Sequence, residues 1–209
     1  MARPKEINSE SLRKINDAAT TEFAEFGLTG ARVDRIARRA GVNKAMIYYH
    51  YSSKENLYVS ILTEKITELS KVIKTKIDSD EGIESVLLTL SQFYNIHLAA
   101  EPRIRQIFLH EMASGAKYMR TSFAEIMQHQ SIPRRLMQVL EKGMDEGKYR
   151  RFDARQAIIA FIGMNFFYIV SSPLVNQVWE IEDEETFRRE RPAEMVRLFL
   201  KGIEKHEES

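Results

Sequence analysis

The sequence predicts an all-α protein: a small N-terminal domain of three helices, residues 1–56, followed by a larger helical domain, residues 57–209. Apolar residues recur at intervals of three and four positions along almost the whole chain, which is the period of an amphipathic helix. Strict alternation of apolar and polar residues never lasts for more than a few positions, so strands are not expected. Glycines, prolines and capping residues divide the pattern into about nine helices.

The first two helices are each marked by an apolar face and a terminal glycine. The first ends at Gly27 and the second at Gly41, where glycine can adopt the left-handed conformation of a helix end. A third, very short helix follows over about residues 44–51, with Asn43 as its N-cap. The residues expected to face the core are Leu12, Ile15, Ala19, Phe23 and Phe26 in the first helix, Val33, Ile36, Ala37 and Ala40 in the second, and Ile47 and Tyr51 in the third.

A long fourth helix is predicted over residues 52–77, opened by a capping box of Ser52 and Glu55. It is long enough to connect two domains. Further helices are predicted at about 83–100, 102–114, 119–130, 133–146, 154–171 and 192–205. Pro102, Pro133 and Pro192 suit the first turn of a helix, and residues 179–191 are expected to form a mobile loop.

Composition excludes several classes of protein. The chain has no cysteine, so it can form neither disulfides nor thiolate metal sites, in keeping with a reducing cytoplasm. The first six residues lack the apolar run of a secretory signal. The longest apolar run, residues 157–170, is shorter than the ~20 residues that cross a bilayer and is interpreted as a buried helix. We therefore expect a cytoplasmic protein with no membrane partner.

The second and third helices together predict a helix-turn-helix. Gly41 allows the turn that swings the short helix across its predecessor, so that the N-terminal residues of the short helix can enter the major groove of DNA. With Ile47 and Tyr51 facing the core, Lys44, Ala45, Tyr48 and Tyr49 face outwards. Residues 1–56 hold ten Lys and Arg against seven Asp and Glu, which mildly favours a basic binding surface.

Each outward residue type can contact DNA in its own way. Lys44 can donate to a phosphate or to a guanine, and Ala45 is small enough to let the backbone approach the groove. Tyrosine and histidine side chains can donate to phosphate oxygens, and a lysine in the first turn of the next helix suits an anion. The residues predicted to contact DNA are Arg32, Asn43, Lys44, Ala45, Met46, Tyr48, Tyr49, His50 and Lys54.

The run Val33–Leu57 closely resembles the DNA-binding signature of the tetracycline-repressor (TetR) family of transcriptional regulators. The stretch Ala18–Gly27 is similar to the first helix of that family. Two positions depart from the family pattern: Met46 replaces a small hydroxyl residue, and Tyr51 replaces a phenylalanine, which is tolerable if its hydroxyl reaches solvent. The resemblance implies a homodimeric regulator, commonly a repressor, that is released from a palindromic operator by a small-molecule effector; an activator role stays open.

The resemblance also implies that the chain from residue 57 onwards binds the effector and forms the dimer. The effector is unknown, and aromatic and methionine side chains at helical spacing are equally typical of a plain core. The residues considered for the effector pocket are Phe93, Tyr94, His97, Phe108, Met112, Phe123, Met127, Phe161, Asn165 and Tyr168. His97 and Asn165 are polar positions on apolar helices and each needs a partner, which can be another side chain, a water or a ligand.

The dimer interface is expected on the helix 154–171, which is apolar nearly all round, and on the last helix. The alternative is that the helix 154–171 is the central core helix of a monomer. The residues predicted for the interface are Ile158, Ile162, Phe166, Ile169, Val196, Phe199 and Ile203.

The sequence argues against two other functions. An enzyme is not expected, because the sequence has no cysteine nucleophile, no glycine-rich phosphate loop and no glutamate three positions before any histidine, the spacing of carboxylate di-metal sites. Catalytic residues, metal ligands and cofactors are therefore not predicted. A helical binder that had lost DNA binding would be expected to lack the cationic and aromatic residues of the short helix, but Lys44, Tyr48 and Tyr49 are all present.

Overall fold

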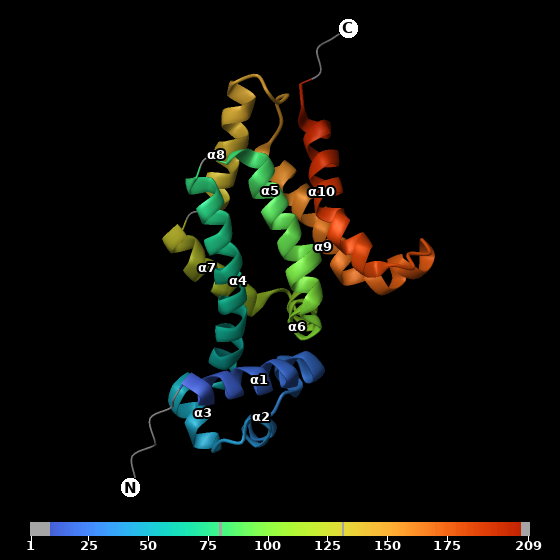
Figure 1. The fold of residues 1–209 in the computed structure, drawn as a ribbon. Coiled ribbons are helices and arrows are strands. Elements are labelled where there is room, and N and C mark those ends of the chain that lie inside the picture. Colours follow the sequence, from blue (N-terminus) through green and yellow to red (C-terminus); the bar gives the residue numbers. More distant parts are fainter. Residues whose placement is uncertain (1–8, 80, 131, 206–209) are drawn as a thin grey trace. The chain divides into compact units, whose positions relative to one another are not determined.

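The computed structural model describes residues 9–79, 81–130 and 132–205, without the side chains of Glu125 and residues 127–130. Over these residues the chain forms ten α-helices and one π-helical turn, which confirms the predicted all-α class (Figure 1). The β-type pairing found among them is an isolated bridge between Tyr149 and Glu204.

The described residues form two compact units. The N-terminal unit runs up to Thr67 and includes Pro102–Glu125; the C-terminal unit comprises Glu68–Glu101 and the residues from Ile126 onwards. This division differs from the boundary at residue 57 that the sequence suggests. The difference arises because α6 (Pro102–Ala113), although distant in sequence, packs on α1 (Ser9–Gly30).

The N-terminal unit contains α1, α2 (Val33–Ala40), α3 (Lys44–Tyr51), the first part of α4 (Lys54–Asp78), α6 and the first part of α7 (Lys117–Gln130). The predicted core faces of its first three helices are largely confirmed. The buried residues include Ile15, Ala19, Phe23, Val33, Ile36, Ala37, Ala40 and Ile47. Phe26 is an exception, since its ring is exposed and lies under the guanidinium group of Arg35, 4.1 Å away.

The end of α1 differs from the prediction. The helix does not stop at Gly27 but kinks there, with φ at 61° and ψ at 178°, and continues to Gly30. This positive φ favours glycine. The ring of His110 in α6 covers the same position: a Cβ added to Gly27 would lie 3.3 Å from His110 Nδ1. Glycine at this position therefore permits both the kink and the close approach of α6.

The two predicted N-caps, Asn43 and Ser52, have different outcomes. Asn43 Oδ1 accepts a hydrogen bond from the Ala45 backbone N–H at 2.8 Å, as expected of an N-cap. The capping box predicted at Ser52 is wrong, because Ser52 has a φ of 64° and forms the C-cap of α3. The neighbouring Ser53 caps α4 instead, because its Oγ accepts a hydrogen bond from the Asn56 backbone N–H at 3.0 Å.

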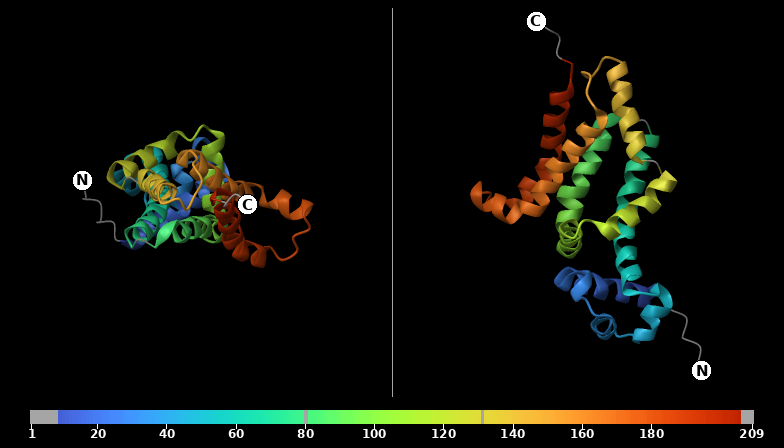
Figure 2. Two further views of the ribbon diagram at one scale, coloured as in Figure 1. Left: turned by 90° about the horizontal axis from the view of Figure 1, so that it is seen from above. Right: turned by 180° about the vertical axis from the view of Figure 1, so that it is seen from behind.

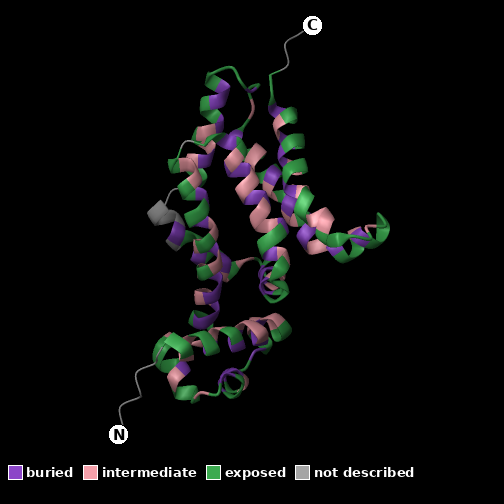
Figure 3. Ribbon diagram, in the orientation of Figure 1, coloured by how far each residue is buried: buried purple, intermediate pink, exposed green. Residues whose placement is uncertain are grey.

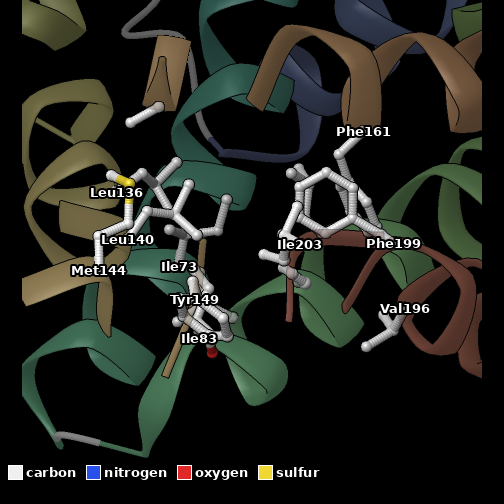
Figure 4. Packing of buried hydrophobic residues seen from close by; sticks show 14 of the residues in the cluster. Ile73, Ile83, Leu136, Leu140, Met144, Tyr149, Phe161, Val196, Phe199 and Ile203 are labelled. Carbon is white, nitrogen blue, oxygen red and sulfur yellow. The ribbon is translucent and has the colours of Figure 1, made fainter. Parts of the chain in front are cut away.

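The C-terminal unit contains the rest of α4 and α7, together with α5 (Gly82–Gln92), the π-helical turn η1 (Phe93–Leu98), α8 (Ile132–Asp145), α9 (Ala154–Val178) and α10 (Glu184–Ile203). One apolar cluster joins these helices (Figure 4). Its members include Ile73, Ile83, Leu136, Leu140, Met144, Tyr149, Phe161, Val196, Phe199 and Ile203. The single helix predicted at 83–100 is thus interrupted by a π-helical turn after Gln92.

The two last helices are longer than predicted and form an antiparallel hairpin (Figure 2). The mobile loop expected at 179–191 is wrong, because α10 begins at Glu184. Asp183 caps this helix by accepting from the Thr186 backbone N–H at 3.0 Å, and Glu184 and Glu185 add favourable negative charge to its first turn. Pro192 consequently lies inside α10 instead of in its first turn.

The observed length of α9 bears on whether this helix could cross a membrane. Its 25 residues are long and apolar enough to cross a membrane by length and composition alone. One such helix is weak evidence of a membrane span, since core helices of soluble proteins pass the same test. One face of α9 is buried in the C-terminal unit and the other is exposed (Figure 3). The exposed face of α9 therefore presents apolar side chains that the rest of the C-terminal unit leaves uncovered.

Candidate nucleic-acid interface

A buried carboxylate fixes α2 against α1. Glu22 is 1% exposed, and its Oε1 accepts hydrogen bonds from Arg35 Nε at 2.6 Å and from the Arg32 backbone N–H at 2.9 Å. The Arg35 guanidinium also donates to the Gly30 carbonyl oxygen at 2.9 Å. These contacts hold the start of α2 in place. The contact between Glu22 and Arg35 was not predicted, although Glu22 lies at helical spacing from Ala18 and Ala19 on the apolar face of α1.

A second contact fixes α3. The Tyr51 hydroxyl donates to Asn16 Oδ1 of α1 at 2.7 Å, and the partial burial of the ring raises the Tyr51 pKa. Tyrosine at this position is therefore accommodated by a partner in α1, not by solvent as the sequence analysis expected. Ile47 is buried on the same side of α3. Together these residues define which face of the short helix is free.

The free face of α3 carries the residues predicted to face outwards. Lys44, Ala45 and His50 are exposed, and Tyr48 and Tyr49 are 42% and 69% exposed. This confirms the predicted orientation of the helix. Met46 is half-buried. The outer face thus presents two phenolic hydroxyls, an imidazole and an ammonium group around a small residue, a set suited to phosphate oxygens and base edges.

The ammonium group of Lys44 is held by α2. Its Nζ lies 2.8 Å from Asp34 Oδ1, and this hydrogen bond raises the pKa of the lysine. Both side chains are exposed, so the pair can open when an anion competes for the lysine. Asp34 was not considered in the sequence analysis. Its position ten residues before Lys44, on a different helix, gives no local signal of the contact.

The remaining predicted DNA contacts lie at the edges of this face. Arg32 is exposed, and His50 places its ring edge-on to Tyr51 at a centroid distance of 4.6 Å. Lys54 is the first residue of α4, as predicted, but it is half-buried and its Nζ donates to the Ala31 carbonyl oxygen at 3.0 Å. Its ammonium group therefore already has one structural partner within the unit.

Comparison with protein families decides the assignment. A model described as bacterial regulatory proteins of the tetR family matches residues 15–61, which hold α2, α3 and most of α1. A second, described as a tetracyclin repressor-like C-terminal domain, matches residues 84–198, more than half of the chain. The chain belongs to the tetR family. The resemblance seen in the helix-turn-helix sequence is thus confirmed over both parts of the molecule.

Individual TetR-family relatives are distant. The HTH-type transcriptional repressor SCO4008 of Streptomyces coelicolor is 34% identical over 102 residues, a match that spans 49% of this chain and 50% of that relative's length. A FadR regulator from Bacillus subtilis, solved in complex with stearoyl-CoA, has a TM-score of 0.71 at 21% identity, with 92% of this chain and 99% of that chain covered. KstR2 of Mycobacterium tuberculosis has a TM-score of 0.69 at 20% identity, covering 96% and 98%. These structural likenesses confirm the fold.

The residues considered for an effector pocket do not form one group. Phe108, Met112 and Phe123 belong to the N-terminal unit, where Met112 and Phe123 are exposed. His97 is also exposed, so the expectation of a buried histidine is wrong. The side chain of Met127 lies outside the described residues. The remaining candidates belong to the C-terminal unit: Phe93, Tyr94, Phe161, Asn165 and Tyr168.

Asn165 has the polar partners that its position requires. Its Oδ1 accepts hydrogen bonds from the Ser91 hydroxyl and from Asn95 Nδ2, the latter at 2.8 Å, and its Nδ2 donates to the Phe161 carbonyl oxygen. All three side chains are fully buried. Asn95 Oδ1, however, has no hydrogen-bond partner among the residues that the structure describes. Asn95 lies in the π-helical turn and was missed from the sequence, although it lies at helical spacing from Ser91 and Leu98 on the buried face.

Most of the residues predicted for the dimer interface pack against other residues of the same chain. Ile169, Val196, Phe199 and Ile203 are buried, and Ile158 and Ile162 pack partly buried against the apolar cluster. Phe166 is half-buried, with its ring 6.2 Å from that of Tyr94. The exposed apolar side chains of α9 lie elsewhere on the helix, at Ile159, Phe167, Leu174 and Val178. We call these four residues the α9 stripe.

Proposed function

We propose that this chain acts in the cytoplasm as a homodimeric repressor that binds a palindromic operator and is released by a small-molecule effector. The observation that carries the proposal is the outer face of α3. Lys44, Tyr48 and Tyr49 project from a helix of eight residues whose opposite face is fixed through Ile47 and Tyr51. A short helix held in this way suits insertion into the major groove, where its N-terminal residues meet base edges.

The side chains divide into base-reading and positioning roles. Lys44 and Ala45 lie in the first turn of α3, so we assign them, with Met46, to the base edges. Tyr48, Tyr49 and His50 follow and are assigned to phosphates, as are Arg32 and Lys54 at the flanks. Asn43 orients the helix, because its Oδ1 already accepts from the Ala45 N–H.

The α9 stripe supports the dimer. Its residues are separated by eight, seven and four positions, spacings that keep them on one side of the helix. Gly163 lies on the same side, and a Cβ there would meet nothing within 4 Å, so a second helix could approach closely. Exposed apolar surface of this kind marks an interaction site, and two copies related by a two-fold axis would cover it with identical surfaces.

An effector would act in the C-terminal unit. Asn95 Oδ1 is a buried acceptor to which no described residue donates, and such a group is costly unless a donor reaches it. A ligand hydroxyl or N–H group could supply that donor. The B. subtilis FadR regulator, which shares the fold, was solved with stearoyl-CoA, so this architecture can hold a small molecule. The effector can weaken operator binding only if it binds the state of the dimer that releases DNA more tightly than the state that binds DNA.

Selection of bound duplexes from a random DNA pool tests this proposal. The selected sequences are expected to be two-fold symmetric, with half-sites about 34–36 Å apart or at a multiple of one helical turn. A variant in which Tyr48 and Tyr49 are both alanine should select nothing, and it should keep the fold because both side chains are exposed. Enrichment of asymmetric single sites would contradict the dimer, and failure to enrich any sequence would contradict the assigned function.

A further inference from the structure

A cleft of about 430 Å³ lies on the α9–α10 hairpin, within the C-terminal unit. Its volume falls in the range of small-molecule sites, which are about 300–1,000 Å³. Its lining is almost wholly apolar and rich in aromatic rings. The lining residues are Phe167, Tyr168, Val175, Trp179, Ile181, Phe187 and Arg191.

Arg191 is the one charged residue of this lining, and the rings around it hold it in place. Its guanidinium carbon lies 4.6 Å from the centroid of Tyr168 and 5.8 Å from that of Phe187. One terminal nitrogen, Nη2, donates to the Met164 carbonyl oxygen at 3.2 Å. The Nε atom is buried and has no hydrogen-bond partner in the described part of the chain. The side chain is therefore fixed within the cleft but incompletely satisfied.

The guanidinium also has no carboxylate partner among the described residues. The nearby Glu184 pairs with Arg188, at 3.4 Å, and not with Arg191. Partial burial lowers the pKa of Arg191, because desolvation disfavours the charged form of the side chain. A cation in an apolar cleft is stabilised when an anion pairs with it.

We propose that this cleft binds a small carboxylate with an apolar, preferably aromatic, body. The carboxylate would accept hydrogen bonds from Arg191, and the body would pack between the rings of Phe187 and Trp179. Such a ligand matches both the charge and the apolar lining of the cleft. The proposal does not depend on DNA binding or on the identity of the effector.

A second copy of the chain is a weaker occupant. Phe167 belongs both to the cleft and to the α9 stripe, so dimerisation could bring another α9 close to this region. However, α9 contains no aspartate or glutamate from Ala154 to Val178. A second α9 could cover the apolar lining but could not pair with the charge of Arg191.

The chain offers a built-in reporter for the test, since Trp179 is its one tryptophan and lies in the cleft. Titrating the full-length protein with 4-phenylbutanoate should shift the emission of this exposed tryptophan. The neutral analogue 4-phenylbutan-1-ol has the same apolar body. The wild-type protein should bind the carboxylate about tenfold more tightly than the alcohol, as expected for a charge-assisted hydrogen bond.

Substitutions test whether the charge of Arg191 causes the preference for the carboxylate. Arg191→Gln should abolish the preference for the carboxylate, and Arg191→Lys should keep part of it. Arg188→Gln is the matched control, since Arg188 is on the same helix and paired with Glu184, and it should keep the full preference. Equal affinity for both probes, no binding of either, or a preference that survives Arg191→Gln would overturn the proposal. A shift of the tryptophan emission that depends on protein concentration and not on ligand concentration would also overturn the proposal, because a second copy of the chain would then occupy the cleft.

Discussion

Arg35 of α2 meets Glu22 of α1 through a hydrogen bond of 2.6 Å between Nε and Oε1, which joins the helix-turn-helix to the helix before it. The carboxylate is 1% exposed, whereas the arginine side chain is 34% exposed. The pair is therefore asymmetric: the arginine can reach water if its partner is removed, but the carboxylate cannot. This asymmetry decides what each substitution does.

Arg35→Ala should destabilise the protein more than Glu22→Gln. Removing the arginine leaves a buried carboxylate poorly paired, which costs about 3–5 kcal/mol, whereas removing the carboxylate loses charged hydrogen bonds worth about 1.5–3 kcal/mol. Urea unfolding measures both. Arg39→Ala is the control, because the Arg39–Glu25 pair is exposed on both sides at 3.9 Å and should change the free energy of unfolding by about 0.5 kcal/mol or less. The reverse order would show that Glu22 is not buried as described.

Lys44→Ala should alter which operators are preferred. If Lys44 reads a guanine, the variant should lose about 1–3 kcal/mol of discrimination at one base position. Lys54→Ala should instead weaken binding to all sequences alike and reduce the salt slope by roughly one unit. Binding isotherms at several salt concentrations separate the two. A selectivity profile for Lys44→Ala identical to that of the wild type would remove Lys44 from the base-reading set.

Asp34→Asn extends the same test. Since Asp34 holds the Lys44 ammonium group in the free protein, its removal should raise affinity for random-sequence DNA. The exposed pair contributes little to stability, so the melting temperature should change little. Unchanged affinity for random DNA would mean that the pair does not compete with DNA for Lys44.

Charges in the α9 stripe should dissociate the proposed dimer without unfolding the chain. The double variant Ile159→Glu and Leu174→Glu places charges on side chains that are exposed in one chain, so helicity should be retained. At an interface the same charges would be desolvated and unpaired, which is costly. Sedimentation should show a monomer. Val72→Glu, an exposed apolar position on α4, is the control and should leave the dimer intact. A dimer that survives the double variant would place the interface elsewhere.

The N-cap of α9 should give a pH-dependent stability. Hydrogen bonds from the Arg155 side chain and backbone lower the pKa of Asp153 from 3.8 to about 2. Because the pKa is lower in the folded state, the carboxylate stabilises the fold fully above about pH 5, and this contribution is lost as the pH falls towards 2. The melting temperature of Asp153→Asn should therefore lie below that of the wild type at pH 7, with a gap that narrows below pH 5. A gap independent of pH would contradict the role of the charge.

Apolar periodicity predicted most of the helices, because each must bury one face. It could also predict the outward face of α3, because Ile47 and Tyr51 must face the core and the opposite side of the helix must then face outwards. Periodicity could not assign the faces of α9, which is apolar nearly all round. Its predicted interface residue Ile169 packs inside the chain, whereas Ile159 is exposed. Which face is covered depends on the helices that pack there, and these are distant in sequence.

The sequence pattern also could not predict which polar side chains contact each other between helices. Glu22 and Asn95 both lie at apolar spacing, so their burial could have been inferred, but their partners could not. The extension of α10 back to Glu184 was missed because Pro192 suggested a helix start. Instead, α10 begins at the Asp183 cap with an acidic first turn and continues through Pro192, although proline cannot donate a backbone hydrogen bond.

The most direct test of sequence-specific regulation is the ratio of two affinities. The full-length protein is titrated against the duplex selected from the random pool and against a shuffled duplex of the same composition, at one salt concentration. Specific DNA-binding proteins prefer their sites by about a thousandfold or more, and we predict a ratio in that range, with two chains bound per duplex. A ratio near one would mean that α3 binds DNA only through phosphates, and it would contradict the proposed function.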